Sequence, residues 1–303
     1  MIVVTGGSGV LGRALVAALN AQGTDVRVLG SSELDLRDRD RTIAWFQRER
    51  PSLVYHLAAK VFGLGGNTQF PAEMFSDNVR INMNVIDGVH LSGCEKIVAV
   101  STVATYSSDA PRPVAETSIW NGEPHRSEGA YGHAKRAMLA QLDAYAKQYQ
   151  LRFAYPIMTN IYGPHDRFDP VHGHVVPSLV AKFFEAKQSG GAVDVWGTGR
   201  AERDFLYADD AAEALIKIGA TFEGPINVAT GRTVPIRRVV EILSADSGVE
   251  NVRWDSTKPD GQLERSYNVE KLDSLGFVPR VTLQEGLDRT FQWFATHYPD
   301  VRR

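Results

Sequence analysis

The chain begins Met1-Ile2-Val3-Val4-Thr5-Gly6-Gly7-Ser8-Gly9-Val10-Leu11-Gly12, and this stretch predicts its fold. The first four residues are typical of a buried strand, and the residues after Gly12 have the apolar face of a helix. Glycines between such a strand and helix leave room for a pyrophosphate at the backbone N–H groups of the helix start. The loop therefore predicts a dinucleotide-binding site, with candidate cofactor contacts at Gly6, Ser8, Gly9, Val10, Leu11 and Gly12.

Strand-like and helix-like stretches alternate through the first half of the chain. The strand-like runs are 26–29, 53–57 and 96–100, and the helical stretches are 11–22, 39–48, 71–92 and 129–149. This alternation is typical of an α/β protein whose parallel sheet carries helices on both faces. We therefore predict a Rossmann-type doubly wound parallel sheet, which binds ligands at the carboxyl ends of its strands.

The pattern changes at about residue 162, where glycines and prolines mark an irregular segment. A helix is predicted at 176–188 and a further strand at 192–196, and short strands and helices alternate after them. We predict an NADP-binding Rossmann domain at 1–161, with return segments near 192–220. Residues 162–303 are predicted to form mainly a smaller C-terminal substrate-binding lobe.

Composition excludes several classes of function. The 303 residues are 43% hydrophobic and 23% charged with a net charge of −3, which is typical of a soluble globular protein without a basic surface for nucleic acid. No stretch is apolar enough for a signal peptide or a membrane span, so we expect no membrane partner and a cytoplasmic location. The single cysteine, Cys94, cannot form an internal disulfide and is interpreted as a buried apolar residue.

A tyrosine and a lysine lie four residues apart at Tyr131 and Lys135, within the helix predicted at 129–149. Residues with this spacing share one face of a helix. The Lys135 ammonium can therefore stabilise the Tyr131 phenolate and lower the phenol pKa from its usual value of ~10. A proton donor of this kind, combined with a dinucleotide loop, indicates a short-chain redox enzyme.

The residues after the second strand indicate which dinucleotide binds. Sites that prefer NAD place an acidic residue there to hold the ribose hydroxyls. Here the chain continues Gly30-Ser31-Ser32, and a small hydroxyl residue such as Ser31 leaves room for a 2′-phosphate. This favours NADP(H) over NAD(H). Arg37 could reach back to that phosphate or lie in solvent as an ordinary loop residue.

With these motifs in place, the chain resembles the extended short-chain dehydrogenase/reductases that act on nucleotide sugars. Three local blocks are similar to GDP-L-fucose synthases. The first is Ala58-Ala59-Lys60-Val61 with Gly63, Asn67-Thr68 and Pro71-Ala72, the second is 159–166 with 174–177, and the third is 195–199 with 203–206. The resemblance runs from residue 1 to about residue 290.

The resemblance implies a reaction on a GDP-4-keto-6-deoxy-hexose, in which the carbons beside the ketone are epimerised and hydride then reduces the ketone. It implies that Thr102 hydrogen-bonds the substrate carbonyl, Tyr131 donates a proton, Lys135 binds the nicotinamide ribose and His174 is an acid/base. It also implies a homodimer formed through a bundle that contains the Tyr131 helix. Further implied cofactor contacts are Ser31, Leu57, Ala58, Ala59, Met158, Asn160 and Ile161, and implied substrate contacts are Lys60, Asn160, Val175, Lys182, Trp196, Arg203 and Arg265.

One position departs from the resemblance. Fucose synthases carry a catalytic cysteine two residues before the tyrosine that corresponds to Tyr106, and the matching residue here is Ala104. Epimerisation beside a ketone needs a base and an acid on opposite faces of the sugar, and alanine is neither. The sequence therefore favours an NADPH-dependent 4-ketoreductase of a nucleotide-diphospho-4-keto-6-deoxy-sugar, GDP-linked and with a hexose or a heptose.

Other interpretations stay open at this point. They are a bifunctional GDP-L-fucose synthase with another base, an NAD-dependent nucleotide-sugar epimerase, and a non-catalytic NADP-binding regulator. A dehydratase is disfavoured because Val103-Ala104 stands where such enzymes carry an Asp-Glu pair. The His172 and His174 pair lacks a third ligand with suitable spacing, so no metal is expected.

Overall fold

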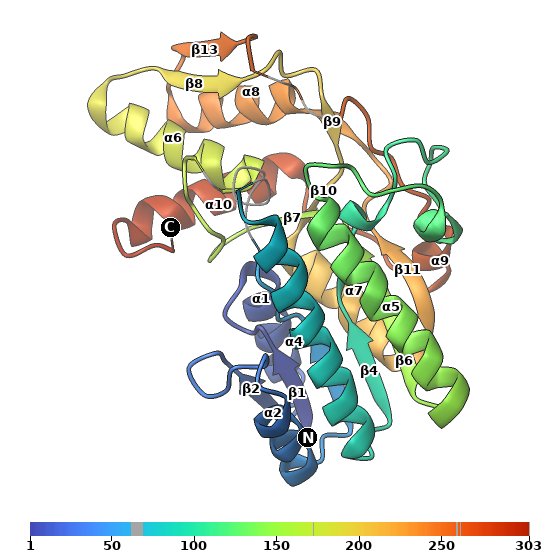
Figure 1. Ribbon diagram of the computed structural model, residues 1–303. Coiled ribbons are helices and arrows are strands. Elements are labelled where there is room, and N and C mark those ends of the chain that lie inside the picture. The colour runs from blue at the N-terminus through green and yellow to red at the C-terminus, as the bar shows by residue number, and fades with distance from the viewer. Residues whose placement is uncertain (62–68, 172, 259, 261, 303) are drawn as a thin grey trace.

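The largest sheet of the described residues is parallel and lies in the lower part of Figure 1. The computed structural model describes residues 1–61, 69–171, 173–258, 260 and 262–302, so Gly63, Asn67, Thr68 and His172 of the sequence motifs lie outside the described residues. The sheet order is β11-β6-β4-β3-β1-β2, with β5 paired to β6. Its strands are β1 (Ile2–Thr5), β2 (Val26–Leu29), β3 (Leu53–His56), β4 (Lys96–Ala99), β5 (Ser101–Thr102), β6 (Arg152–Met158) and β11 (Gly224–Val228).

Helices cover both faces of this sheet, because successive apolar strand residues point to opposite sides. In β1, Val3 belongs to the core beneath α2 (Arg39–Glu49), α4 (Pro71–Leu91) and α5 (Gly129–Tyr149). Its neighbour Val4 belongs to the core beneath α1 (Val10–Ala21) and α7 (Ala208–Thr221). The doubly wound α/β fold that the sequence predicts is confirmed.

A separate hydrophobic core lies beyond the carboxyl ends of the strands, in the elements drawn above the sheet in Figure 1. Three helices pack around it, and the strands near it form two-stranded pairs. The helices are α6 (Val175–Ser189), α8 (Ile236–Ser247) and α10 (Leu283–His297), and the pairs are β8 (Val193–Trp196) with β13 (Val252–Asp255), β7 (Asn160–Tyr162) with β10 (Phe205–Tyr207), and β9 (Glu202–Arg203) with β12 (Val234–Pro235). The remaining elements are η1 (Val103–Thr105), η2 (Glu116–Trp120) and α9 (Glu270–Ser274).

The segment predicted to return near 192–220 divides between the two cores. It begins with β8, which pairs with β13 and packs against the core of α6 and α8. Its second half contains α7, which packs on α1, and β11 then pairs with β6. An alternating apolar strand such as 192–196 fits either core equally well, so only its partner decides where it goes. The domain boundary at 161/162 stays a prediction.

Cys94 is buried, as the sequence predicts, and burial raises the pKa of its thiol to about 11. Among the described residues, no helix is both long and apolar enough to cross a bilayer.

Candidate active site

The glycine loop joins β1 to α1 and is shaped by two close approaches. Gly6 has a φ of +73°, and a Cβ there would lie 2.6 Å from the backbone nitrogen of Ala58, at the end of the neighbouring strand β3. A Cβ on Gly12 would collide with the Gly6 carbonyl. Both glycines let the loop fold tightly against the sheet.

The start of α1 is open to an anion. Its N-cap is Gly9, no side chain caps the helix, and no acidic residue lies in its first turn. Ser8 beside it is exposed, whereas Leu11 and Gly12 are buried. Uncapped N–H groups together with the positive end of a helix suit a pyrophosphate. The loop therefore fits a dinucleotide.

The residues beside the glycine loop follow the carboxyl ends of β2 and β3. Thr5 Oγ1 accepts a hydrogen bond from Ala58 N at 3.2 Å and contacts His56 Nδ1 at 2.8 Å, which ties the turn 57–59 to the glycine loop. Ser31, after β2, is exposed. Arg37 does not reach back toward it, because its guanidinium hydrogen-bonds Asp35, with the closest contact at 2.7 Å, and Asp77 at 3.3 Å.

Three of the four catalytic residues implied by the resemblance lie near the carboxyl ends of β5 and β6, namely Thr102, Tyr131 and Lys135. Thr102 pairs in register with Met158, and its Oγ1 accepts from Ala104 N at 3.2 Å, so its own hydrogen can still be donated. Lys135 lies beneath them, buried, and its Nζ donates to the Val100 carbonyl at 2.7 Å and lies 5.8 Å from the centroid of the Tyr131 ring. Asn160 and Ile161 follow on β7, where the Asn160 amide donates to the Asp204 carbonyl at 2.9 Å.

The prediction that Lys135 lowers the pKa of the Tyr131 phenol is wrong in this arrangement. Burial, and after it the charge of Glu128, raises the pKa of Tyr131 well above its usual value. Burial also lowers the pKa of Lys135 to about 7. A buried site disfavours both the phenolate and the ammonium, so Tyr131 is held as a proton donor.

Two arginines predicted to contact substrate lie together. Arg203 Nη1 donates to the carbonyls of Glu202 at 2.7 Å and Gln262 at 2.6 Å, and Arg265 Nε donates to the Gln262 side chain. Burial and then the charge of Arg265 lower the pKa of Arg203, so the two cations feel each other. Residues 62 positions apart in the sequence thus form one cationic cluster.

The ring of Trp196 lies near two lysine side chains. Its exposed ring, 57% accessible, lies 6.0 Å from Lys182 Nζ and 5.7 Å from Lys258 Nζ, measured to the ring centroid. Lys182 also donates to the Asp194 carbonyl at 3.0 Å. An exposed indole between two ammonium groups suits a flat ring that carries phosphates.

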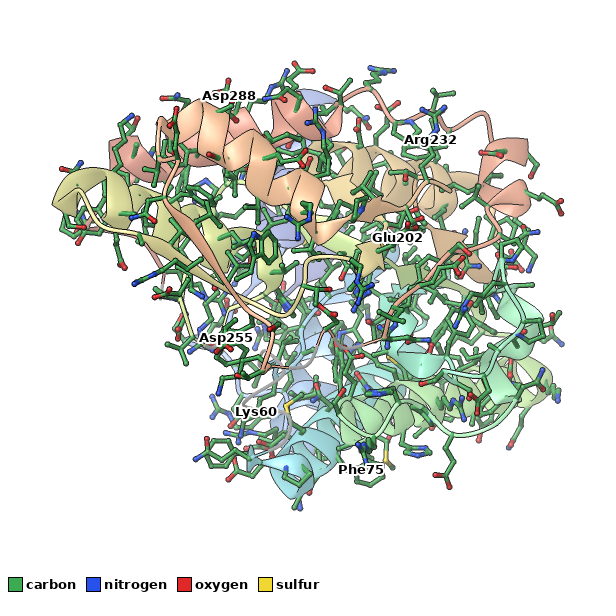
Figure 2. All side chains as sticks on the ribbon, turned by 90° about the horizontal axis from the view of Figure 1, so that it is seen from above. Lys60, Phe75, Glu202, Arg232, Asp255 and Asp288 are labelled. Atoms are coloured by element: carbon green, nitrogen blue, oxygen red, sulfur yellow. The ribbon has the colours of Figure 1, made fainter. Side chains whose placement is uncertain are left out.

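Other predicted substrate residues lie elsewhere. Lys60 is engaged by two carboxylates of α4, Glu73 at 2.6 Å and Asp77 at 2.9 Å. In Figure 2 it lies near α4, together with Phe75 of that helix, whereas Glu202 lies toward the middle of the view. The Lys60 ammonium is therefore paired with two carboxylates of α4.

His174 is exposed at the N-cap of α6, and Val175 begins that helix. The buried Asp166 lies near it: burial raises the pKa of Asp166 to about 6, opposed by the charge of His174. Among the described residues, no three metal-ligating side chains come together.

Sequence reasoning missed two charged residues of the site, Glu128 and Lys258. Glu128 Oε2 accepts from Arg265 Nη2 at 2.9 Å, and Lys258 lies over Trp196. An acid at the start of a helix and a lysine in a turn are ordinary features. Their partners lie far along the chain, so no local signal marked them.

The comparisons with known proteins agree with this geometry. Residues 2–229 match the model of the NAD dependent epimerase/dehydratase family. The chain is similar to GDP-L-fucose synthase 1 of Arabidopsis thaliana, with 35% identity over 97% of this chain and 92% of the relative.

Two solved structures are also similar. One is a GDP-L-fucose synthetase from Naegleria fowleri bound to NADP, with a TM-score of 0.91, 30% identity, and coverage of 100% of this chain and 96% of that one. The other is a GDP-mannoheptose C4 reductase from Campylobacter jejuni with NADP bound, with a TM-score of 0.87, 25% identity, and coverage of 97% and 98%.

Proposed function

This chain belongs to the NAD dependent epimerase/dehydratase family, and we propose that it reduces the C4 ketone of a GDP-linked 4-keto-6-deoxy-sugar without epimerising the neighbouring carbons. It is an NADP-dependent oxidoreductase that acts on nucleotide sugars, as its GDP-L-fucose synthase relatives and NADP-bound structural neighbours show. The cofactor predicted from the sequence, NADP(H), is thereby confirmed. The sugar, a hexose or a heptose, and the absence of epimerisation are the proposal.

The side chains have complementary roles in this reaction. Thr102 Oγ donates a hydrogen bond to the C4 carbonyl oxygen, and the Tyr131 phenol gives that oxygen its proton, so the ketone becomes an alcohol. NADP(H), when bound, supplies the hydride that forms the new C4–H bond. The Tyr131 ring centroid lies 5.8 Å from Lys135 Nζ, and the phenol regains its proton from solvent after the transfer.

The observation that carries the proposal is the side chain at residue 104. Ala104 is buried in η1, and its backbone lies against Gly132, the residue after Tyr131: a Cβ on Gly132 would lie 2.5 Å from the Ala104 carbonyl. A methyl group at this place cannot take a proton from a sugar carbon. The carboxylate of Glu128, three residues before Tyr131, is already ion-paired with Arg265.

The test is reduction of GDP-4-keto-6-deoxymannose by NADPH in D2O, with the product read by mass spectrometry and NMR. We expect one alcohol with the substrate's stereochemistry at C3 and C5 and no deuterium there above the no-enzyme background. A reaction with Tyr131→Phe protein gives the background exchange in the presence of a folded site. Enzyme-dependent deuterium at C3 or C5 would overturn the proposal.

The bifunctional GDP-L-fucose synthase is the second candidate. The names of the curated relatives favour it, and so does His174, which matches the acid/base histidine of that resemblance. In this case the same D2O experiment gives deuterium at C3 and C5 and an L-configured product.

We also propose a homodimer formed through α4 and α5, which pack side by side. Phe75 and Met83 on α4 are 43% and 49% exposed, and their spacing puts both on one face of the helix. Met83→Asp should convert the dimer to a monomer in light scattering, and a wild type that is already monomeric contradicts the idea. The cytoplasmic location stays a prediction.

A further inference from the structure

Glu128 occupies an unusual place at the start of α5. It is the N-cap residue of that helix, three residues before Tyr131, yet its side chain caps no backbone N–H. An acid at this position ordinarily accepts a hydrogen bond from the first turn of its own helix. Here the carboxylate turns instead to Arg265, 137 residues away in the sequence, at 2.9 Å.

This ion pair is held out of bulk water. The side chains of Arg265 and Glu128 are 14% and 24% exposed. Burial opposes the charge of Arg265, but the Glu128 carboxylate and the Tyr267 side chain together raise the pKa of Arg265. A partly buried, charge-assisted hydrogen bond of this kind restricts a long side chain to one geometry.

The position of Arg203 is linked to that of Arg265. Gln262 links the two arginines, because its carbonyl accepts from Arg203 Nη1 and its side-chain oxygen accepts from Arg265 Nε. Three acids beside these arginines in the sequence have other partners: Asp204 accepts from Thr230 and Arg232, Glu202 from Thr233, and Glu264 pairs with Arg112. The cluster therefore contains two guanidinium groups and one carboxylate that pairs with them, which leaves it with a net positive charge.

We propose that Glu128 is a positioning residue that holds Arg265 where the diphosphate of the nucleotide sugar binds, between Arg265 and Arg203. The inference rests on the proposed function for the identity of this ligand as a nucleoside diphosphate group. Arg265 uses Nη2 for Glu128 and Nε for Gln262. These two bonds hold the guanidinium in one place, and an arginine already held in place loses less side-chain entropy when it binds a phosphate.

The sign of one substitution separates this idea from simple charge repulsion. Removal of an acid near an anion site tightens anion binding if the acid only repels the ligand. Removal of an acid that positions an arginine loosens binding, although a negative charge is lost. Glu128→Ala therefore has opposite outcomes under the two readings.

The experiment measures GDP binding to NADP-loaded protein by calorimetry, which needs no turnover. We expect Glu128→Ala to weaken GDP binding by about tenfold or more, the scale of a lost charge-assisted hydrogen bond. Glu128→Gln keeps an oxygen for Arg265 and should stay within about threefold of wild type, a difference below ~1 kcal/mol. Glu123→Ala, an exposed acid in the loop before α5, is the matched control and should bind GDP as wild type does.

A double-mutant cycle tests whether Glu128 acts through Arg265. Once Arg265→Ala is in place, adding Glu128→Ala should change GDP affinity by less than about twofold. Independent losses that multiply in the double variant, or tighter GDP binding by Glu128→Ala, overturn the proposal. So does a wild type that binds neither GDP nor dTDP, whereas the D2O experiment tests the reductase proposal separately. Thermal unfolding and NADP affinity show that each variant is folded.

Discussion

Two alanine substitutions in the glycine loop should lower the folding free energy by different amounts. In Gly12→Ala the new methyl group meets the Gly6 carbonyl and lies 2.7 Å from Gly7 Cα, both backbone atoms that cannot move aside. Such overpacking costs roughly 1–3 kcal/mol of folding free energy. In Gly9→Ala the methyl meets only the Gly6 carbonyl at 3.7 Å, and the φ of −78° suits alanine. The loss of folding free energy should then be about 0.5 kcal/mol, the difference between glycine and alanine at an N-cap.

Gly9→Ala should weaken cofactor binding although it scarcely changes stability. Space beside Gly9 is open in the protein, so its methyl group would enter the volume where a pyrophosphate contacts the helix start. We expect Gly9→Ala to unfold close to the wild-type temperature and to bind NADPH at least about tenfold more weakly, a loss of ~1.4 kcal/mol. Gly12→Ala should melt several degrees lower and lose affinity as well. Urea unfolding and NADPH fluorescence titration measure both quantities. Wild-type NADPH affinity in Gly9→Ala would refute the cofactor placement, and wild-type stability in Gly12→Ala would refute the packing argument.

Three further predictions concern the chemistry. Tyr131→Phe should lower kcat by roughly 10²–10⁴-fold with NADPH affinity unchanged, because only the proton donor is lost; a variant that keeps a tenth of wild-type kcat would contradict this role. Arg203→Ala should raise KM for the nucleotide sugar more than it lowers kcat, by about 1.5–3 kcal/mol for a charged hydrogen bond, and steady-state kinetics with an unchanged KM would remove Arg203 from the site. Burial lowers the pKa of Lys135 in the folded protein to about 7, whereas a lysine in the unfolded chain has a pKa near ~10.4. Between these two pH values the unfolded chain binds one more proton than the folded protein does. The free energy of unfolding should therefore rise with pH in this range. Urea unfolding at pH 7.5 and pH 9 should show this rise in wild type and not in Lys135→Met, and equal slopes in the two proteins would exclude Lys135 as its source.

Much of the cofactor half could be predicted from the sequence because its signals are local. A strand, a glycine turn and a helix follow one another within residues 2–21, and their geometry needs no distant partner. The helix at 129–149 that carries Tyr131 and Lys135 has the predicted bounds for the same reason. The spacing of two residues on one helix is set by the helix itself.

The direction in which the pKa values of Tyr131 and Lys135 shift could not be predicted from the sequence. The sequence suggested that a lysine beside a tyrosine would lower the phenol pKa, because charges attract. The structure buries Lys135 beside the half-buried Tyr131 and directs the Lys135 ammonium to the Val100 carbonyl. Desolvation then decides the direction of both shifts, and burial is a property of the packed chain.

By itself the sequence determined the parallel α/β sheet, the dinucleotide loop, the pairing of Tyr131 with Lys135, and the alanine at position 104. These features depend on residue type and on spacings of a few positions, which a chain carries wherever it folds. The tertiary structure alone decided that β8 joins the second core, that Arg203 and Arg265 form one cluster, and that Glu128 pairs with Arg265. Each of these contacts joins residues at least 59 positions apart, and only the packing of the whole chain chooses one partner among the many that local chemistry would accept.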